Sequence, residues 1–318
     1  MSKKGVFLFP GQGSQYLGMG RDFYEKYSAA RQIFDQADEY LGYSLSTIIF
    51  EGPAEKLVQT KYSQVAIFVM SMALLAVLQE TIPSFCPSFC AGLSLGEYSA
   101  LCACKKIGFK ECLELVKVRG ESMQQACEKY PGSLWVVLGL DAQDVEDAIK
   151  DTQDIWIANL NCPKQVVIAG TYDAFKQAES VLKEKGAKRV LPLEVSGAFH
   201  SGLMKEAQEK LEVKIKQVDI KASDISIVMN VCGAVVQDPV SIQKYLIEQV
   251  VSPTRWEKGI RLLEAEGVDY YIEIGCGKTL SGMNKKIGVT APTYSIEKIE
   301  DLEKLEMLLK ESSDVVGK

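Results

Sequence analysis

Ser94 has the surroundings of a nucleophile, because it lies between two glycines in the segment Gly92-Leu93-Ser94-Leu95-Gly96. A Gly-x-Ser-x-Gly pattern is typical of a sharp strand-to-helix turn, whose small flanking residues let the serine oxygen project. The first free N–H groups of the following helix, beginning at Leu95, would face the oxyanion of a tetrahedral intermediate. The same short pattern also occurs in ordinary loops, so a catalytic interpretation needs a base elsewhere in the chain.

His200 is the one histidine among 318 residues and therefore the only imidazole available as that base. Imidazole suits the role because its unperturbed pKa is about 6.5. The residue lies in the segment Val195-Ser196-Gly197-Ala198-Phe199-His200-Ser201, a small-residue turn before a predicted helix. A surface or structural histidine is the alternative. If the chain is a Ser-His enzyme, His200 is its base.

Two short strands are expected to position this chemistry. A strand over residues 6–9 is stopped by Pro10 and leads into the loop Gly11-Gln12-Gly13, which can present backbone N–H groups. A second strand, over residues 89–92, ends beside Ser94, as the elbow requires. The loop lacks the Lys-Ser/Thr ending of a phosphate-binding P-loop. Around these strands the apolar pattern predicts helices over residues 21–41, 62–79, 95–104 and 109–127.

The order of predicted strands and helices changes after residue 133. Strands over 134–140, 155–159, 165–169 and 190–193, with helices over 141–150 and 174–185, give the order β-α-β-β-α-β, which is typical of a ferredoxin-like unit. We therefore expect a small ferredoxin-like subdomain, residues 131–196, inserted into a larger α/β-hydrolase-like subdomain with a parallel sheet, residues 1–130 and 197–318. The larger part resumes with predicted helices over 203–216, 240–250 and 255–266, strands over 227–229 and 269–274, and a helix ending at 287.

Composition excludes several classes of function. With 47% hydrophobic and 25% charged residues the chain can bury a large core, and its longest apolar run, residues 65–78, is shorter than the roughly 20 residues of a membrane span. We expect no membrane association and no signal peptide. Nine cysteines without a Cys-x-x-Cys pair indicate a reducing, cytoplasmic setting and, with a single histidine, no metal site. A net charge of −6 argues against nucleic-acid binding.

Several separated segments together resemble the malonyl-CoA:acyl carrier protein transacylase family, and they occur in the family's order across nearly the whole chain. They are Phe9-Pro10-Gly11-Gln12-Gly13-Ser14-Gln15, Gly92-Leu93-Ser94-Leu95-Gly96-Glu97-Tyr98, the segment around Arg119, Asn161-Cys162-Pro163-Lys164-Gln165-Val166-Val167-Ile168, Ser196-Gly197-Ala198-Phe199-His200-Ser201 and Glu273-Ile274-Gly275-Cys276-Gly277-Lys278.

The resemblance implies a role for each matching residue. Ser94 would take the malonyl group from its thioester, and His200 would remove the serine proton and later activate the incoming thiol. The backbone N–H groups of Gln12 and Leu95 would form the oxyanion hole. Arg119 would bind the free malonyl carboxylate through two hydrogen bonds, which a planar guanidinium does well; a solvent-facing helix charge is the alternative for such a residue.

Further implied roles depend on the resemblance alone. No acidic third member of a triad is identifiable, and Gln249 matches the position whose backbone carbonyl orients the histidine. Phe199 matches the malonyl-selective form of its segment, with core packing as the alternative. Asn161 and Gln165 would line the cleft from the small subdomain.

Two positions depart from the family pattern. Leu93 replaces the histidine that usually precedes the nucleophile, so such a histidine cannot be essential here. The replacement can still alter the rate of acyl transfer and the rate at which water hydrolyses the acyl-serine. Cys276 replaces the proline of a Gly-Pro-Gly turn, which should loosen one turn without altering the chemistry.

The expected partners are a coenzyme A thioester and the holo form of an acyl carrier protein, with no cofactor and a monomeric enzyme. The rival interpretations are a serine esterase or thioesterase of related fold, a non-catalytic carrier-binding scaffold, and an acyltransferase of polyketide rather than fatty-acid synthesis. Carrier proteins of this family are typically acidic, so docking would use basic residues. The candidates are Lys188, Arg189, Lys278, Lys285 and Lys286.

Overall fold

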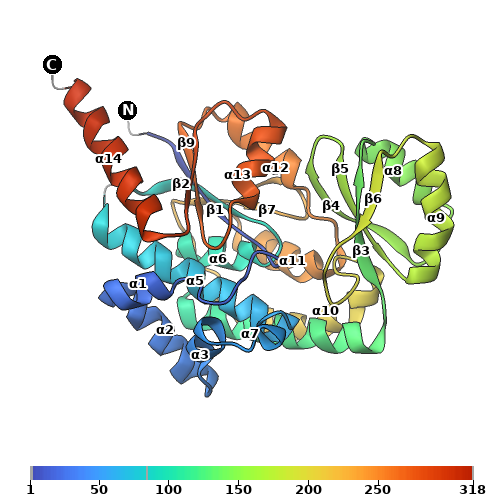
Figure 1. Ribbon diagram of the computed structural model, residues 1–318, viewed down its shortest axis with the longest axis horizontal. Coiled ribbons are helices and arrows are strands. Elements are labelled where there is room, and N and C mark those ends of the chain that lie inside the picture. Colours follow the sequence, from blue (N-terminus) through green and yellow to red (C-terminus); the bar gives the residue numbers. More distant parts are fainter. Residues whose placement is uncertain (1–2, 84, 317–318) are drawn as a thin grey trace.

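A six-stranded sheet with helices on both faces forms the larger part of the protein (Figure 1). The structure is a computed structural model that describes residues 3–83 and 85–316. The strand order is β10-β9-β1-β2-β7-β8, and every neighbouring pair is parallel except β7 and β8. The fold is therefore α/β with a mixed sheet. Its strands are β1 (Gly5–Phe9), β2 (Pro87–Gly92), β7 (Ser226–Met229), β8 (Ala234–Val236), β9 (Tyr270–Ile274) and β10 (Thr293–Ile296).

The side chains of β1 alternate between two cores. Phe7 and Phe9 belong to the large hydrophobic cluster on one face of the sheet, and Val6 and Leu8 belong to the cluster on the other. All four are fully buried. Central parallel strands are apolar throughout because helices cover both faces, which explains why this strand is recognisable in the sequence.

Helices on the two faces differ in number. The smaller cluster is covered by α12 (Trp256–Ala265) and α13 (Thr279–Ile287). The larger cluster takes in most of the other helices of this part. They are α1 (Arg21–Lys26), α2 (Ser28–Leu41), α3 (Leu45–Phe50), α4 (Ala54–Leu57), α5 (Thr60–Thr81), α6 (Gly96–Ala103), α7 (Phe109–Lys129), α10 (Lys205–Ile215), α11 (Pro239–Glu248) and α14 (Ile299–Val316).

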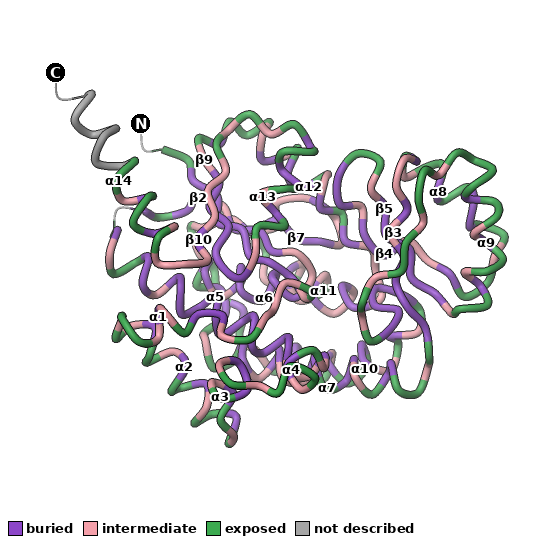
Figure 2. Tube along the Cα trace, viewed as in Figure 1, coloured by how far each residue is buried: buried purple, intermediate pink, exposed green. Residues whose placement is uncertain are grey.

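The helix α5 is the central helix of the larger cluster. Its 22 residues are long and apolar enough to cross a membrane by length and composition, but 83% of its most apolar window is buried inside the protein. Figure 2 shows this helix mostly as buried chain. The burial is that of a core helix, as residues 62–79 were expected to form, with the ends extended to Thr60 and Thr81.

A second sheet of four strands lies at the end of the molecule away from both termini (Figure 1). Its order is β4-β5-β3-β6, and all its neighbouring pairs are antiparallel. Two helices pack on its outer face around a separate core that includes Trp135, Ile168 and Leu182. Along the chain the elements are β3 (Ser133–Leu138), α8 (Ala142–Ile149), β4 (Ile155–Cys162), β5 (Gln165–Gly170), α9 (Tyr172–Glu184) and β6 (Arg189–Pro192).

The structure departs from the predicted elements at several places. The helix predicted over 21–41 is divided at Tyr27, whose extended backbone ends α1 and begins α2. The helix predicted over 240–250 ends at Glu248 and continues as a short 3-10 turn, η2 (Gln249–Val251), and a similar turn, η1 (Gly202–Met204), precedes α10. The sheet is not wholly parallel, because β8 forms a hairpin with β7. Elements that were not predicted are α3, α4, β8, β10 and α14.

Candidate active site

Ser94 lies in the tight turn between β2 and α6. Its φ is 53°, in the left-handed region that side chains other than glycine rarely adopt. The glycines on either side are required by close backbone approaches: a Cβ on Gly92 would overlap the carbonyl of Gly96, and a Cβ on Gly96 would overlap the carbonyl of Phe9. The turn therefore has the strained, side-chain-free form of a nucleophile elbow.

His200 meets Ser94 from the segment that leads into η1. Its Nε2 lies 2.7 Å from Ser94 Oγ, and its Nδ1 lies 2.9 Å from the carbonyl oxygen of Gln249 and 3.1 Å from that of Ser252. Because carbonyl oxygens only accept, Nδ1 carries the hydrogen and Nε2 turns its lone pair toward the serine hydroxyl. His200 also has a left-handed φ, of 59°.

The environment of His200 keeps the ring neutral. Burial, and then the positive charge of Arg119, lower the pKa of His200 to about 4, against the opposing effect of the two carbonyl acceptors. Only 3% of the residue is exposed. At neutral pH the imidazole is therefore free of the extra proton that would prevent it from accepting one from Ser94.

Arg119 reaches the same point from the middle of α7. Its guanidinium donates to Gln64 Oε1 at 2.7 Å, to Gln249 Oε1 at 2.9 Å and to Ser94 Oγ at 3.0 Å. The residue is 1% exposed, and burial lowers its pKa. None of the ion pairs found within residues 3–83 and 85–316 includes Arg119. A buried guanidinium beside the serine oxygen thus lacks a directly bound carboxylate.

Gln249 connects the base, the guanidinium and the elbow. Its backbone oxygen accepts from His200, and its side-chain Oε1 accepts from Arg119. Its Nε2 donates to the backbone oxygen of Ser94 at 2.8 Å and to Glu97 Oε2 at 2.7 Å. The residue is fully buried on η2, so the 3-10 turn that replaces the end of the predicted helix places both its carbonyl and its amide in the site.

The Gln12 loop lies beside the elbow because β1 and β2 are paired in parallel, with Phe9 opposite Gly92. A Cβ on Gly11 would come within 2.6 Å of the Leu93 oxygen, so the loop passes close to the turn. In the described part of the chain, neither the N–H of Gln12 nor that of Leu95 donates a hydrogen bond. Two donors are thus left free next to Ser94.

The remaining residues of the predicted cleft are less closely tied to the serine. Phe199 is 5% exposed and packs into the larger core beside His200. Asn161 is 6% exposed on β4, and its Oδ1 has no partner among the described residues. Gln165 accepts from Lys286 Nζ at 3.0 Å. Within the ranges that the structure covers, no hydrogen bond joins Asn161 or Gln165 to Ser94.

Three residues of the site were missed by sequence reasoning. Asn230 accepts from the N–H of Ser94 at 2.7 Å and donates to the Gly92 oxygen at 2.7 Å. Glu97 and Gln64 hydrogen-bond to Gln249 and Arg119 respectively. Signals for two of them existed: Asn230 directly follows a predicted strand, and Gln64 is a polar residue at the start of the most apolar helix. Glu97 resembled an ordinary solvent-facing acid in a first helical turn.

The two positions that depart from the family pattern lie in apolar surroundings. Leu93 is half-buried and packs on the smaller hydrophobic cluster. Cys276 is fully buried, and its Sγ lies 3.1 Å from Ser14 Oγ on the Gln12 loop. Neither makes a hydrogen bond to Ser94 or His200 in the part of the chain that the structure describes. Over the same residues, no group of three or more His, Cys, Asp or Glu side chains could hold a metal ion.

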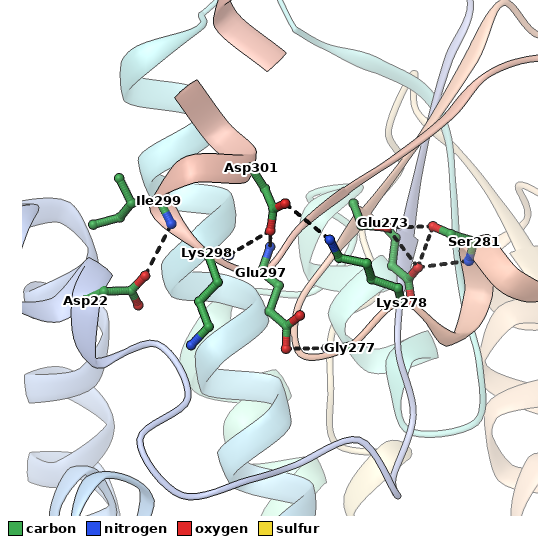
Figure 3. Close-up of polar contacts among 10 residues, drawn as sticks. Asp22, Glu273, Gly277, Lys278, Ser281, Glu297, Lys298, Ile299 and Asp301 are labelled. Carbon is green, nitrogen blue, oxygen red and sulfur yellow. Dashed lines mark hydrogen bonds and ion pairs between the residues drawn. The ribbon is translucent and has the colours of Figure 1, made fainter. Parts of the chain in front are cut away.

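The predicted docking residues are all exposed but belong to different elements. Lys188 and Arg189 lie at β6, and Lys285 and Lys286 lie in the last turn of α13. Lys278 points toward Asp301 and pairs with it at 3.3 Å (Figure 3). The Asp301 carboxylate also accepts the backbone N–H groups of Glu297 and Lys298. The charge of Lys278 is therefore partly satisfied within the protein.

Comparison with known proteins gives consistent matches over nearly the whole chain. Residues 6–289 match the family model described as "Acyl transferase domain". The malonyl CoA-acyl carrier protein transacylase of Bacillus subtilis is 45% identical over 313 residues, which are 97% of this chain and 98% of that protein. The solved transacylase of the same name from Clostridium perfringens has a TM-score of 0.93 and 34% identity, covering 99% of this chain and 100% of its own. A malonyl-transacylase solved in complex with a type II PKS acyl-carrier protein has a TM-score of 0.90 and 37% identity, covering 94% and 97%.

Proposed function

This chain belongs to the acyl transferase family and, within it, to the malonyl CoA-acyl carrier protein transacylases, and from that premise we propose how its residues perform the reaction. The enzyme transfers a malonyl group from malonyl-CoA, through a malonyl-serine intermediate, to the phosphopantetheine thiol of an acyl carrier protein that serves fatty-acid or polyketide synthesis. The roles of the individual side chains are our proposal.

In the first half-reaction, Nε2 of His200 takes the proton of Ser94 as Oγ attacks the thioester carbonyl. The resulting oxyanion accepts hydrogen bonds from the N–H groups of Gln12 and Leu95, each contributing on the order of 3 kcal/mol to the transition state. The intermediate then expels the coenzyme A thiolate, which takes the proton from His200. In the second half-reaction, His200 takes the proton of the carrier thiol as its sulfur attacks the malonyl-serine carbonyl. The bond from this carbonyl to Ser94 Oγ then breaks, and the imidazolium of His200 returns the proton to Oγ.

The carbonyl oxygens of Gln249 and Ser252 act where other Ser-His enzymes place a carboxylate. They hold the Nδ1 hydrogen of His200 at 2.9 and 3.1 Å and so keep the ring in the tautomer that accepts a proton at Nε2. They also stabilise the imidazolium once it forms, without adding a negative charge.

Selection of malonyl groups rests on Arg119, and the observation that carries it is the burial of its guanidinium against Ser94 Oγ without a carboxylate partner. A buried cation is costly unless an anion compensates it. The malonyl carboxylate is such an anion, and a planar guanidinium can bind both its oxygens. The substrate of a general esterase carries no carboxylate that Arg119 could bind.

Mass measurement of the intact protein tests the proposal. After mixing with malonyl-CoA we expect a malonyl adduct that is absent from Ser94→Ala, and after addition of holo acyl carrier protein we expect the adduct to move to the carrier. Rapid release of free malonate without carrier acylation would instead favour a serine esterase or thioesterase. The absence of any adduct would favour a non-catalytic carrier-binding scaffold.

Phe199, Asn161 and Gln165 are proposed to shape the acyl and thioester cleft. The ring of Phe199 is buried next to His200, where it limits room for a substituent on the acyl α-carbon. The Oδ1 of Asn161 is buried without a partner among the described residues, so it is available to a donor on the substrate. Gln165 contacts Lys286 and would act from the edge of the cleft.

Carrier docking is proposed to use the exposed bases around the small sheet and α13. Lys286 and Lys285 are the best placed of these, because Lys278 already pairs with Asp301. Lys188 and Arg189 lie at β6, the edge strand of the small sheet opposite to β4, and would offer a separate positive charge to the carrier. An acidic carrier would be attracted there despite the net charge of −6.

The division of the chain into two subdomains is likewise a proposal. The strand order β4-β5-β3-β6, with both helices on one face, supports a ferredoxin-like subdomain over residues 131–196. The parallel strands and the elbow support an α/β-hydrolase-like larger subdomain over 1–130 and 197–318.

We further propose that the enzyme acts as a cytoplasmic monomer without a cofactor or a membrane partner. One chain supplies every proposed catalytic group, which supports a monomer. Its nine cysteines are free thiols, which suits a reducing compartment.

A further inference from the structure

Glu97 is a fully buried acid that the proposed mechanism does not use. It lies in the first turn of α6, three residues after the nucleophile. Its carboxylate accepts three hydrogen bonds: from the backbone N–H of Asn230 at 2.5 Å, from Asn230 Nδ2 at 2.8 Å and from Gln249 Nε2 at 2.7 Å. All three partners are donors, so the surroundings of Glu97 match the ionised carboxylate.

Both partners of Glu97 are themselves bonded to the elbow. Asn230 accepts the N–H of Ser94 and donates to the Gly92 oxygen, while Gln249 donates to the Ser94 oxygen. One buried carboxylate thus orients the two amides that hold the backbone of the nucleophile from either side. If either amide were reversed, its oxygen would face acceptors and its NH2 group would face a donor.

The amide of Gln249 also fixes the position of the guanidinium. Because Glu97 Oε2 and the Ser94 oxygen are both acceptors, the NH2 end of this amide must face them. Its oxygen is then left to face Arg119, from which it accepts at 2.9 Å. The chain from carboxylate to amide to guanidinium joins two buried, opposite charges through one neutral side chain.

We propose that Glu97 is a positioning residue for malonyl recognition: by orienting the Gln249 amide, it holds Arg119 beside Ser94 for the malonyl carboxylate. The inference rests on the proposed role of Arg119. Removing the ionised carboxylate takes away one of the two acceptors that hold the Gln249 NH2 group, which loosens this amide and with it the oxygen that holds the guanidinium. Acyl groups without a carboxylate do not use Arg119, so they are affected far less.

Burial raises the pKa of Glu97 to about 7, against the opposing effects of Asn230, Gln249 and Arg119. Its protonated form therefore becomes populated as the pH falls through 7. The other titratable groups packed around it are Arg119 from α7, Tyr98 on its own helix and Cys232 after β7. Of these, burial raises the pKa values of Tyr98 and Cys232, so neither ionises near pH 7.

The test compares Glu97→Gln with wild type and with Glu121→Gln, an exposed acid on the same helix as Arg119 that serves as the matched control. The rate of Ser94 acylation is measured by intact mass with malonyl-CoA and, separately, with acetyl-CoA. For Glu97→Gln we expect the malonyl rate to fall at least about tenfold relative to the acetyl rate. For Glu121→Gln we expect no change in that ratio.

A purely structural role for Glu97 would lower both rates equally, and that result would overturn the inference while leaving the proposed function intact. Failure of the wild type to form any malonyl adduct would sink the proposed function itself. If Glu97→Gln does not fold, the wild-type enzyme provides the test. The rate of Ser94 acylation with malonyl-CoA, divided by the rate with acetyl-CoA, should decline between pH 8 and pH 6 as Glu97 becomes protonated. A ratio that stays constant over this range contradicts the inference.

Discussion

Replacing Arg119 with alanine separates recognition of the malonyl carboxylate from the acyl-transfer chemistry. The guanidinium is buried and donates to Gln64, Gln249 and Ser94 Oγ. Its proposed substrate partner would replace the bond to Ser94 Oγ with bonds to both carboxylate oxygens. Ser94, His200 and the free N–H groups of Gln12 and Leu95 remain in the variant, so it keeps a nucleophile, a base and an oxyanion hole.

The size of the effect follows from the number of bonds lost. Charge-assisted hydrogen bonds contribute about 1.5–3 kcal/mol each, so the loss of two amounts to about 3 kcal/mol or more. This corresponds to a fall in kcat/KM for malonyl-CoA on the order of a hundredfold. For acetyl-CoA we expect less than about a fivefold change. The rate can even rise, because the positive charge that lowers the pKa of His200 is gone.

The assay is single-turnover acylation of Ser94 followed by intact mass measurement, with both thioesters and with Arg119→Lys as a second variant. Arg119→Lys keeps the charge but loses the planar two-pronged geometry, so it should lie between wild type and alanine with malonyl-CoA. Equal losses with both thioesters would refute the assignment of Arg119, because a group that only supports the fold cannot distinguish the two acyl chains.

Three further results are expected. The pKa of His200 is about 4 in the folded state and about 6.5 unfolded, so the unfolded state binds more protons between these values. Protonation linked to His200 should lower the free energy of unfolding by about 2 kcal/mol between pH 7 and pH 5. Glu97 acts in the opposite direction over this range, because its raised pKa makes the folded state bind the extra proton. The His200 effect is therefore measured by urea unfolding as a difference: stability should fall by that amount more in wild type than in His200→Gln, and equal changes in the two proteins would contradict it. Gly92→Ala should lower Tm by about 5 °C, because its Cβ meets the Gly96 carbonyl. Gly282→Ala, in open space on α13, should not lower it. Lys285→Glu, in the last turn of α13, should raise the KM for the carrier about threefold and leave malonyl loading unchanged, whereas Lys176→Glu on α9 should change neither quantity.

Local signals in the sequence were sufficient to predict the two strands beside the site and the turn that follows the second of them. The apolar residues 6–9 and the glycines around Ser94 predicted β1, β2 and the elbow, because parallel central strands and tight turns restrict residue type strongly. The roles of Arg119 and Gln249 depended on resemblance to a family. Residues on α7 and η2 meet at Ser94 only through tertiary packing, which no spacing in the chain reveals.

Other parts of the site could not be predicted for the same reason. Glu97 is polar and follows the elbow, which in a helix pattern indicates a solvent-facing acid; its burial depends on Asn230 and Gln249, 133 and 152 residues away. The strands β8 and β10 are short, and only one residue of the two, Ile296, is buried, so they lack a clear periodic signal. Tyr27 divides a pattern of apolar residues that would otherwise continue as one helix.

Both reacting residues, Ser94 and His200, have positive φ angles, of 53° and 59°. Such a backbone costs about 1 kcal/mol or more for a residue with a Cβ, and glycine adopts it without this cost. Selection for heat resistance alone would thus favour replacing the very residues that react. Directed evolution of this enzyme toward higher melting temperature should therefore score acyl transfer in every round, since the fastest gains lie where activity is lost.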